Sequence, residues 1–241
     1  MPRFYCPEPL EIGLKIKLPE SITKHIQVLR LTVSDSITLF NGQGGEFSAS
    51  ISELGKNLAM VEIKAFFARE LEPDHSLTLA QGLPEANKMD WIIEKAVELG
   101  ATAFIPLAAS RSVVKLTADR AEKKMRHWQG VMAAAAEQCG RNRLPHLAEP
   151  VNFGHWVAQT DLHKRLLLSP RGTVTLSDWA RHQPPQALTI MVGPEGGFSE
   201  AEEELAIQRG AICVSMGERI LRTETAGLAA LAAIQALWGE M

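Results

Sequence analysis

Two glycine-rich turns near the C-terminus constrain the fold of this chain more than any other feature. The first is Gly193–Gly197 and the second is Gly217–Thr225. Each follows an apolar run typical of a strand and precedes a run typical of a helix. Ser199 and Glu202 have capping-box spacing, which predicts that the first helix begins there. Strand, turn and helix in succession predict a crevice at the carboxyl ends of parallel strands, where open α/β sheets bind ligands.

The composition of these turns limits the ligand. Neither the Gly-x-Gly-x-x-Gly of dinucleotide folds nor the Gly-Lys-Ser/Thr ending of a P-loop is present. Pro194 lacks a backbone N–H and Glu195 adds a carboxylate, and both features disfavour a pyrophosphate. They suit a ligand with cationic character, such as an amine or a sulfonium. A structural turn is the commoner meaning of one such motif, but two close together favour binding.

Composition narrows the class of protein. A chain of 241 residues forms one large domain or two small ones. The three cysteines are scattered, which argues against a disulfide framework or a zinc site and favours a reducing cytoplasm. No apolar run has the length of a membrane span, and the first residues lack an apolar signal region. We therefore expect a cytoplasmic protein without a membrane partner.

Charge is unevenly distributed along the chain. The net charge is −3, yet residues 111–143 contain eight Lys and Arg against three Asp and Glu. A basic stretch of this kind can follow RNA phosphates. A solvated helix face is the commoner cause of such a run.

The hydrophobic pattern changes near Glu72 and Pro73. Before this point, alternating residues and the Asn41-Gly42 turn predict several short strands and a small β-barrel. After it, strands alternate with helices, which predicts a mainly parallel α/β sheet. The predicted domains are 1–72 and 73–241. The final helix, 226–238, is apolar on all sides, and we expect it to form a subunit interface.

Several segments together resemble a known family. They include Gly193-Pro194-Glu195-Gly196-Gly197, the run Ile220-Leu221-Arg222-Thr223-Glu224-Thr225-Ala226, Arg3-Phe4-Tyr5, 95–100 and 137–145. The chain resembles the bacterial 16S ribosomal RNA methyltransferase E family over nearly its whole length. That family belongs to the SPOUT class and makes 3-methyluridine with S-adenosylmethionine. The resemblance implies a PUA-like RNA-binding domain, a C-terminal trefoil knot, a homodimer with its active site at the interface, and no metal.

The resemblance also implies a donor site. Backbone groups and small side chains at the strand ends would surround S-adenosylmethionine, and Ile220 and Leu221 would pack on its adenine. The residues expected to bind the donor are Leu168, Ser169, Val192, Gly193, Pro194, Glu195, Gly196, Gly197, Met216, Gly217, Ile220, Leu221, Arg222, Thr223 and Thr225.

Methylation of a uridine ring nitrogen requires loss of its imide proton, and the resulting charge spreads onto the carbonyl oxygens. Arg222 is the first candidate to stabilise that charge. Arg141 or Arg143 would assist, either from the same subunit or from the other subunit of a dimer. The general base is open between Glu195, Glu224, Glu137 and water. For Glu224, a favourable charge at a helix N-terminus is an equally good interpretation.

Contact with RNA is expected from the N-terminal domain and from the basic loop. Arg141 and Arg143 follow a helix end between Gly140 and Pro145, so we expect both to be exposed and to face substrate. Helix-capping positive charge is the structural alternative for this loop. The residues expected to contact RNA are Arg3, His25, Arg30, Arg111, Lys115, Gln138, Arg141, Asn142 and Arg143.

Three other functions compete with this interpretation. A sibling SPOUT enzyme would methylate a ribose or a transfer RNA base. A non-catalytic RNA-binding assembly factor would use only the N-terminal domain, although the intact donor motif argues against it. A dinucleotide oxidoreductase is disfavoured by the missing glycine fingerprint. The expected partner is 16S ribosomal RNA, presented in the assembled small subunit.

Overall fold

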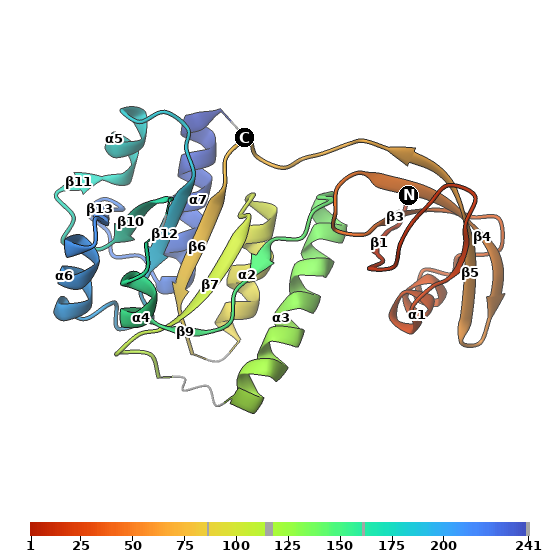
Figure 1. Ribbon diagram of the computed structural model, residues 1–241, viewed down its shortest axis with the longest axis horizontal. Coiled ribbons are helices and arrows are strands. Elements are labelled where there is room, and N and C mark those ends of the chain that lie inside the picture. The colour runs from red at the N-terminus through yellow and green to blue at the C-terminus, as the bar shows by residue number, and fades with distance from the viewer. Residues whose placement is uncertain (86, 114–117, 161, 240–241) are drawn as a thin grey trace. The chain divides into compact units, whose positions relative to one another are not determined.

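The computed structural model describes residues 1–85, 87–113, 118–160 and 162–239. Two compact units make up the chain (Figure 1). The N-terminal unit contains Met1–Glu72 together with Ala136–Leu144. The C-terminal unit contains Pro73–Ala135 and Pro145–Met241. The chain therefore passes from one unit to the other three times.

The N-terminal unit is built on a five-stranded sheet in the order β1-β3-β4-β5-β2, in which β1 runs parallel to β3 and the other pairs are antiparallel. One helix, α1, packs against it and buries Ile22 and Ile26 in the same core as Phe4. The elements are β1 (Arg3–Tyr5), β2 (Lys15–Lys17), α1 (Glu20–Val28), β3 (Ser36–Phe40), β4 (Glu46–Gly55) and β5 (Leu58–Phe67).

The C-terminal unit contains an eight-stranded sheet in which every pair of neighbours is parallel. Its order is β11-β13-β10-β12-β6-β7-β8, and β9 also pairs with β7. The central strands β6 and β12 are buried along their whole length because helices cover both faces of the sheet. The strands are β6 (Leu77–Gly82), β7 (Ala103–Ala108), β8 (His146–Leu147), β9 (Val151–Asn152), β10 (Lys164–Leu168), β11 (Val174–Thr175), β12 (Leu188–Val192) and β13 (Ile212–Ser215).

Helices lie on both faces of this sheet (Figure 1). Successive residues of a strand point to opposite faces of the sheet. In β12, Met191 clusters with Phe153 of α4, whereas the next residue, Val192, lies against Gly227 of α7. Helices α2 and α5 pack on α7, and α4 packs on α6. The helices are α2 (Lys88–Glu98), α3 (Ala118–Cys139), α4 (Phe153–Val157), α5 (Leu176–Arg181), α6 (Glu200–Gln208) and α7 (Thr223–Trp238).

Local sequence patterns predicted several of these elements. The capping box is present, since the Ser199 hydroxyl accepts from the Glu202 N–H at 3.3 Å and Glu202 accepts from the Ser199 N–H at 2.9 Å. Helix α2 buries the apolar side chains of Met89, Ile92, Ile93, Ala96 and Val97, which have the spacing of one helix face. No helix in the described part of the chain is long and apolar enough to cross a membrane.

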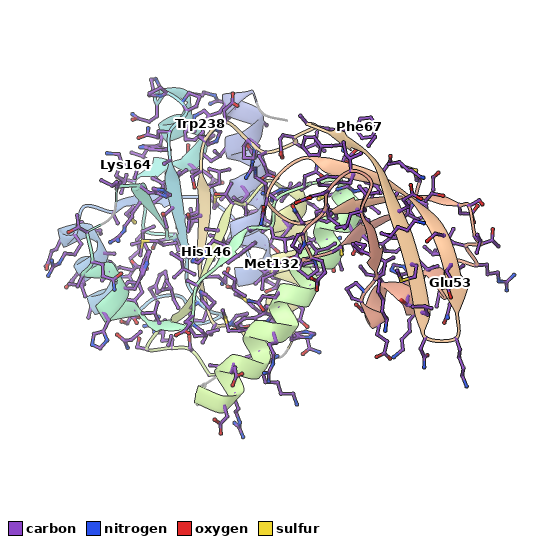
Figure 2. The ribbon with its side chains drawn as sticks, turned by 45° about the vertical axis from the view of Figure 1, so that its right-hand side comes forward. Glu53, Phe67, Met132, His146, Lys164 and Trp238 are labelled. Atoms are coloured by element: carbon purple, nitrogen blue, oxygen red, sulfur yellow. The ribbon has the colours of Figure 1, made fainter. Side chains whose placement is uncertain are left out.

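The apolar character of α7 has an explanation within one chain. Leu231 and Ile234 are fully buried, and α7 lies between α2, α5 and the sheet. Gln235, its polar member, donates to the Leu99 carbonyl at 3.3 Å. Near the same end of α7, the indole of Trp238, which is labelled in Figure 2, donates to the Ala180 carbonyl at 3.2 Å. The apolar pattern of α7 is therefore explained in part by the burial of Leu231 and Ile234 in the protein's own core, and the expected subunit interface stays a prediction.

Candidate active site at the ends of the parallel strands

A cavity of about 570 Å³ lies where β10, β12 and β13 end. Both glycine-rich turns line it, together with the loop after β10. The sequence-predicted donor residues found in its wall are Leu168, Ser169, Val192, Gly193, Pro194, Glu195, Gly196, Gly197, Met216, Gly217, Ile220, Leu221, Arg222 and Thr223. Thr225, which was also expected there, is exposed and lies outside this lining.

Close backbone packing forms the first turn. The Gly197 N–H donates to the Pro194 carbonyl at 2.8 Å, and Gly197 has a φ of +67°. A Cβ at Gly193 would lie 2.6 Å from the Phe198 nitrogen, and one at Gly82 would lie 2.6 Å from Pro194. Glycine is therefore required at these positions so that the ends of β6 and β12 can meet the turn.

A buried hydrogen-bond network joins the two turns. The Thr223 hydroxyl donates to the Gly193 carbonyl at 2.6 Å, and the Gln81 amide donates to the Thr223 hydroxyl at 2.9 Å. Gln81 and Thr223 are both buried. Thr223 thus holds the turns together through its side chain. Sequence reasoning missed Gln81, although a polar residue in the otherwise apolar β6 was a usable sign.

The Glu195 carboxylate accepts hydrogen bonds from two neighbouring residues. Its Oε1 accepts from Lys88 Nζ at 2.6 Å and from the Glu85 N–H at 3.0 Å. Burial alone would raise the pKa of Glu195, but these hydrogen bonds outweigh it and hold the pKa below its ordinary value. The same bond to Glu195 is the main cause that raises the pKa of Lys88. Lys88 also lines the cavity, and no motif in the sequence singled it out.

Arg222 and Glu224 stand at the start of α7 and line the same cavity. Arg222 is exposed, and no described residue bonds or pairs with its guanidinium. The Glu224 side chain is only 17% exposed. Its Oε2 is buried and has no hydrogen-bond partner among the described residues. The nearest cation is Lys88, whose Nζ lies 3.9 Å from that oxygen.

Further side chains complete the wall of the cavity. Ser169 donates to Glu203 at 3.2 Å, and Arg171 pairs with Glu203 at 3.4 Å. Ile220 is 84% exposed and presents an apolar surface. Arg111, expected to contact RNA, lines the cavity and donates to the Gly196 carbonyl at 2.7 Å. No cluster of metal-ligating side chains is found in the described part of the chain.

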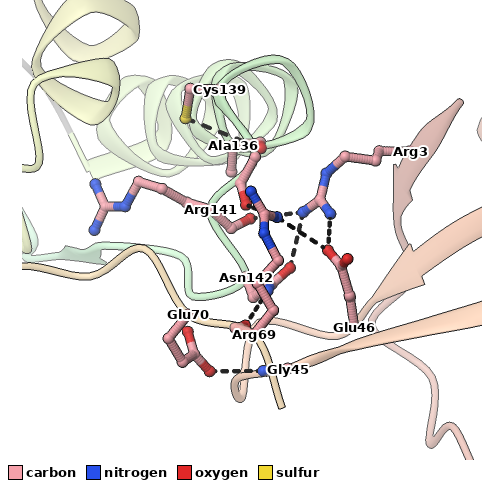
Figure 3. A network of polar contacts seen from close by, with 10 residues as sticks. Arg3, Gly45, Glu46, Arg69, Glu70, Ala136, Cys139, Arg141 and Asn142 are labelled. Carbon is pink, nitrogen blue, oxygen red and sulfur yellow. Dashed lines mark hydrogen bonds and ion pairs between the residues drawn. The ribbon is translucent and has the colours of Figure 1, made fainter. Parts of the chain in front are cut away.

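The loop after α3 belongs to the N-terminal unit and is densely bonded there (Figure 3). Arg141 is 3% exposed and forms a two-point ion pair with Glu72, with Nε 3.0 Å from Oε1. Asn142 is fully buried, accepts from Arg3 at 2.8 Å and donates to the Arg69 carbonyl. The expectation that Arg141 is exposed is therefore wrong, because Glu72 supplies a buried partner.

Several other residues that are expected to contact RNA are exposed to solvent. Arg143 is 53% exposed at its side chain and lies 3.8 Å from Glu70. Arg3 is partly buried, pairs with Glu46 and also donates to the Arg141 carbonyl at 3.1 Å. Lys115 lies outside the described residues. Those that are exposed in the N-terminal unit are His25, Arg30, Gln138 and Arg143.

Glu137, one of the candidate bases, lies in the N-terminal unit rather than in the cavity wall. Its Oε1 accepts from the Tyr5 N–H at 2.8 Å. Burial raises its pKa, although the Tyr5 N–H and the charges of His25 and Arg3 act against that shift. These contacts assign the Glu137 carboxylate to the anchoring of β1.

Comparison with known proteins agrees with this architecture. The RNA methyltransferase domain family matches residues 71–235, and the RNA methyltransferase PUA domain family matches residues 18–64. A ribosomal RNA small subunit methyltransferase E of Neisseria gonorrhoeae, solved with S-adenosyl methionine, is 38% identical, with a TM-score of 0.91 over 99% of this chain and 98% of that one. A methyltransferase of Legionella pneumophila, solved with the same cofactor, is 36% identical, with a TM-score of 0.92 over 97% and 96%.

A curated relative extends the match. The ribosomal RNA small subunit methyltransferase E of Buchnera aphidicola is 32% identical over 100% of this chain and 98% of its own length. These matches confirm the predicted SPOUT-type parallel α/β sheet preceded by a PUA-like domain, and the C-terminal trefoil knot stays a prediction. The chain belongs to the ribosomal RNA small subunit methyltransferase E family.

Proposed function

We propose that this chain transfers a methyl group from S-adenosylmethionine to N3 of a uridine in 16S ribosomal RNA. The observation that carries the proposal is the cavity that both glycine-rich turns line, with an exposed arginine and an unbonded carboxylate oxygen in its wall. Relatives named for small-subunit ribosomal RNA support the substrate, and a relative solved with S-adenosyl methionine supports the donor. We further propose a cytoplasmic homodimer that acts on the assembled small subunit.

The cavity fits the proposed donor in size and chemistry. Its volume of about 570 Å³ falls within the range of roughly 300–1,000 Å³ typical of small-molecule sites. Glu195, Glu203 and Glu224 line it, while Pro194 offers no N–H for a phosphate. The exposed Ile220 gives the apolar surface that an adenine ring requires. When bound, the donor supplies an activated methyl group on a sulfonium.

The residues of the chain then have to position the base and stabilise its charge. Positioning contributes most to such a reaction because the methyl group is already activated. Arg222 is exposed in the cavity wall and its guanidinium has no partner among the described residues, so it is available to a developing anion. We assign it to the carbonyl oxygens of the uracil, which receive the charge of the deprotonated nitrogen.

Binding of RNA is assigned to the N-terminal unit. The PUA domain match covers residues 18–64, and exposed cationic side chains include Arg30 and Arg143. A base must leave its stack before its ring nitrogen can be methylated, and an RNA loop allows this at low cost. We propose that residues 1–72 bind RNA while residues 73–241 bind the donor and carry out transfer.

The test is mass spectrometry of 16S ribosomal RNA from cells that lack the protein and from complemented cells. We expect 3-methyluridine only in the presence of the chain. Purified protein, small subunits and labelled donor should reproduce the modification in vitro. A methylated ribose or a modified transfer RNA would instead identify a sibling activity. Absence of donor binding by calorimetry would indicate an assembly factor.

A further inference from the structure

Three acidic residues could accept the imide proton, and the structure gives them different surroundings. Glu137 lies in the N-terminal unit, where the Tyr5 N–H occupies its Oε1. Glu195 accepts two hydrogen bonds on one oxygen. Only Glu224 combines a place in the cavity wall with a buried oxygen that no described residue bonds. An unfilled buried acceptor is costly, so a ligand donor is its natural partner.

Lys88 lies close to the carboxylates of Glu195 and Glu224, but the two distances differ. Its Nζ is 2.6 Å from Glu195 Oε1, a hydrogen bond, and 3.9 Å from Glu224 Oε2, which is beyond hydrogen-bond length. The ammonium therefore attracts the Glu224 carboxylate by its charge without forming a hydrogen bond to this oxygen. The hydrogen bond to Glu195 holds the Lys88 ammonium at this distance from Glu224.

We propose that Glu224 accepts the imide proton of the target base and that Lys88, whose ammonium lies beside this carboxylate, is the positioning residue. This inference rests on the proposed function and adds to it the proton acceptor and a residue absent from every motif. In the step, the N–H bond breaks and its electron pair remains on N3 and the two carbonyl oxygens. The proton moves to the Glu224 carboxylate, whose side chain is 17% exposed, and Arg222 stabilises the resulting anion.

Other charged groups surround this carboxylate and have to be held constant in any test. Glu85 precedes α2 and acts on Lys88 by its charge. Glu195 lies on the first turn and Glu203 on α6, and both line the cavity. The remaining charged residues of the cavity wall are Arg111, Arg171, Arg219 and Arg222.

The competing interpretation is structural. A carboxylate in the first turn of a helix stabilises the helix through its dipole. Under that interpretation, Glu224→Gln would lower the melting temperature slightly and leave the pH dependence of the rate unchanged. The two interpretations therefore differ in the rate profile rather than in stability.

The experiment measures single-turnover methylation of small subunits at saturating donor across a range of pH. We expect Glu224→Gln to lower the rate by about 10²–10⁴-fold near neutral pH, with recovery as rising pH ionises the imide directly. Lys88→Met should move the acidic limb of the profile to higher pH, and Lys88→Arg should restore it. Calorimetric donor affinity should stay within a few-fold of wild type. Glu94→Gln, on the far side of α2 and paired with Lys95, is the matched control.

Each result has a distinct meaning. An undiminished rate in Glu224→Gln, with an unchanged profile, would overturn this inference alone, since 3-methyluridine would still be formed. A Lys88→Met variant that loses donor affinity but keeps the wild-type profile would overturn the role of Lys88 and assign it to donor binding. If the wild-type protein forms no 3-methyluridine, the proposed function fails, and this inference fails with it.

Discussion

The donor cavity and the segment of residues 136–144 both contain glycine and arginine, yet their polar side chains have opposite surroundings. In the cavity, Arg222 is exposed and without a partner among the described residues, and a Glu224 oxygen is unbonded. In the loop, Arg141 and Asn142 are buried and bonded to Glu72, Arg3 and Arg69. The cavity therefore leaves Arg222 available to a ligand, whereas the side chains of Arg141 and Asn142 are bonded within the N-terminal unit.

This difference shows what decides the role of an arginine. Arg141 and Arg143 are separated by one residue, but the first is 3% exposed and the second keeps a side chain that is 53% exposed. A carboxylate close enough to be desolvated together with the guanidinium converts the first into a structural group. The position of that carboxylate in space, and not the motif around the arginine, sets the outcome.

The largest expected effect tests whether the cavity is a ligand site. A Cβ at Gly196 would lie 3.3 Å from two carbons of Arg111, so Gly196→Val places its methyl groups against Arg111 and the donor space. We expect donor binding to be abolished while the circular dichroism spectrum and melting temperature stay near wild type. Gly130→Ala, at a helix position with open space, is the control. Undiminished donor affinity in Gly196→Val, measured by calorimetry, would move the donor elsewhere.

The second test removes the buried arginine. Arg141→Ala leaves the partly buried Glu72 without its partner, which should cost about 2–3 kcal/mol of unfolding free energy in the N-terminal unit, less than for a fully buried pair. Arg143→Ala removes an equal charge from the same loop and should change stability by less than about 0.5 kcal/mol. Urea unfolding gives both values. Equal stability of the two variants would erase the distinction between the buried and the exposed arginine.

The third test removes the unpaired arginine of the cavity. Arg222→Ala should lower the single-turnover rate by about 10²–10³-fold at saturating RNA and donor, because a preorganised donor to the uracil anion is lost. Its stability should be unchanged, since no described residue depends on the guanidinium. Arg181→Ala, on the surface of α5, is the control. If Arg222→Ala loses only RNA affinity and keeps its saturated rate, its assignment to catalysis is wrong.

The smallest effect concerns the exposed arginine of the loop. Arg143→Ala should weaken RNA binding modestly and reduce the slope of log K against log salt by about 1, as one phosphate contact is lost. Filter binding across a salt series measures this slope. Lys64→Ala, which removes an exposed charge paired with Glu62, serves as the reference. An unchanged slope would remove Arg143 from the RNA surface.

Much of the cavity could be predicted from sequence because its determinants are local. Glycines at the strand ends and the Ser199–Glu202 box follow from near-neighbour geometry, and the cavity wall contains nearly all the expected donor residues. Long-range partners could not be predicted. Lys88 is separated from Glu195 by more than a hundred residues, and Glu72 from Arg141 by 69. The burial of α7 likewise depends on how helices stack, which an apolar pattern alone leaves open.

The N-terminal unit consists of two separate stretches of sequence, and this affects how it folds during synthesis on the ribosome. Residues 136–144 are synthesised only after residues 73–135, yet they carry the partners of Arg3, Tyr5 and Glu72. At translation rates of about 5–20 residues per second, the delay between residue 72 and residue 144 is roughly 4–14 s. During that interval Arg3, Tyr5 and Glu72 lack these partners. The N-terminal unit can be completed only after residues 136–144 have been synthesised.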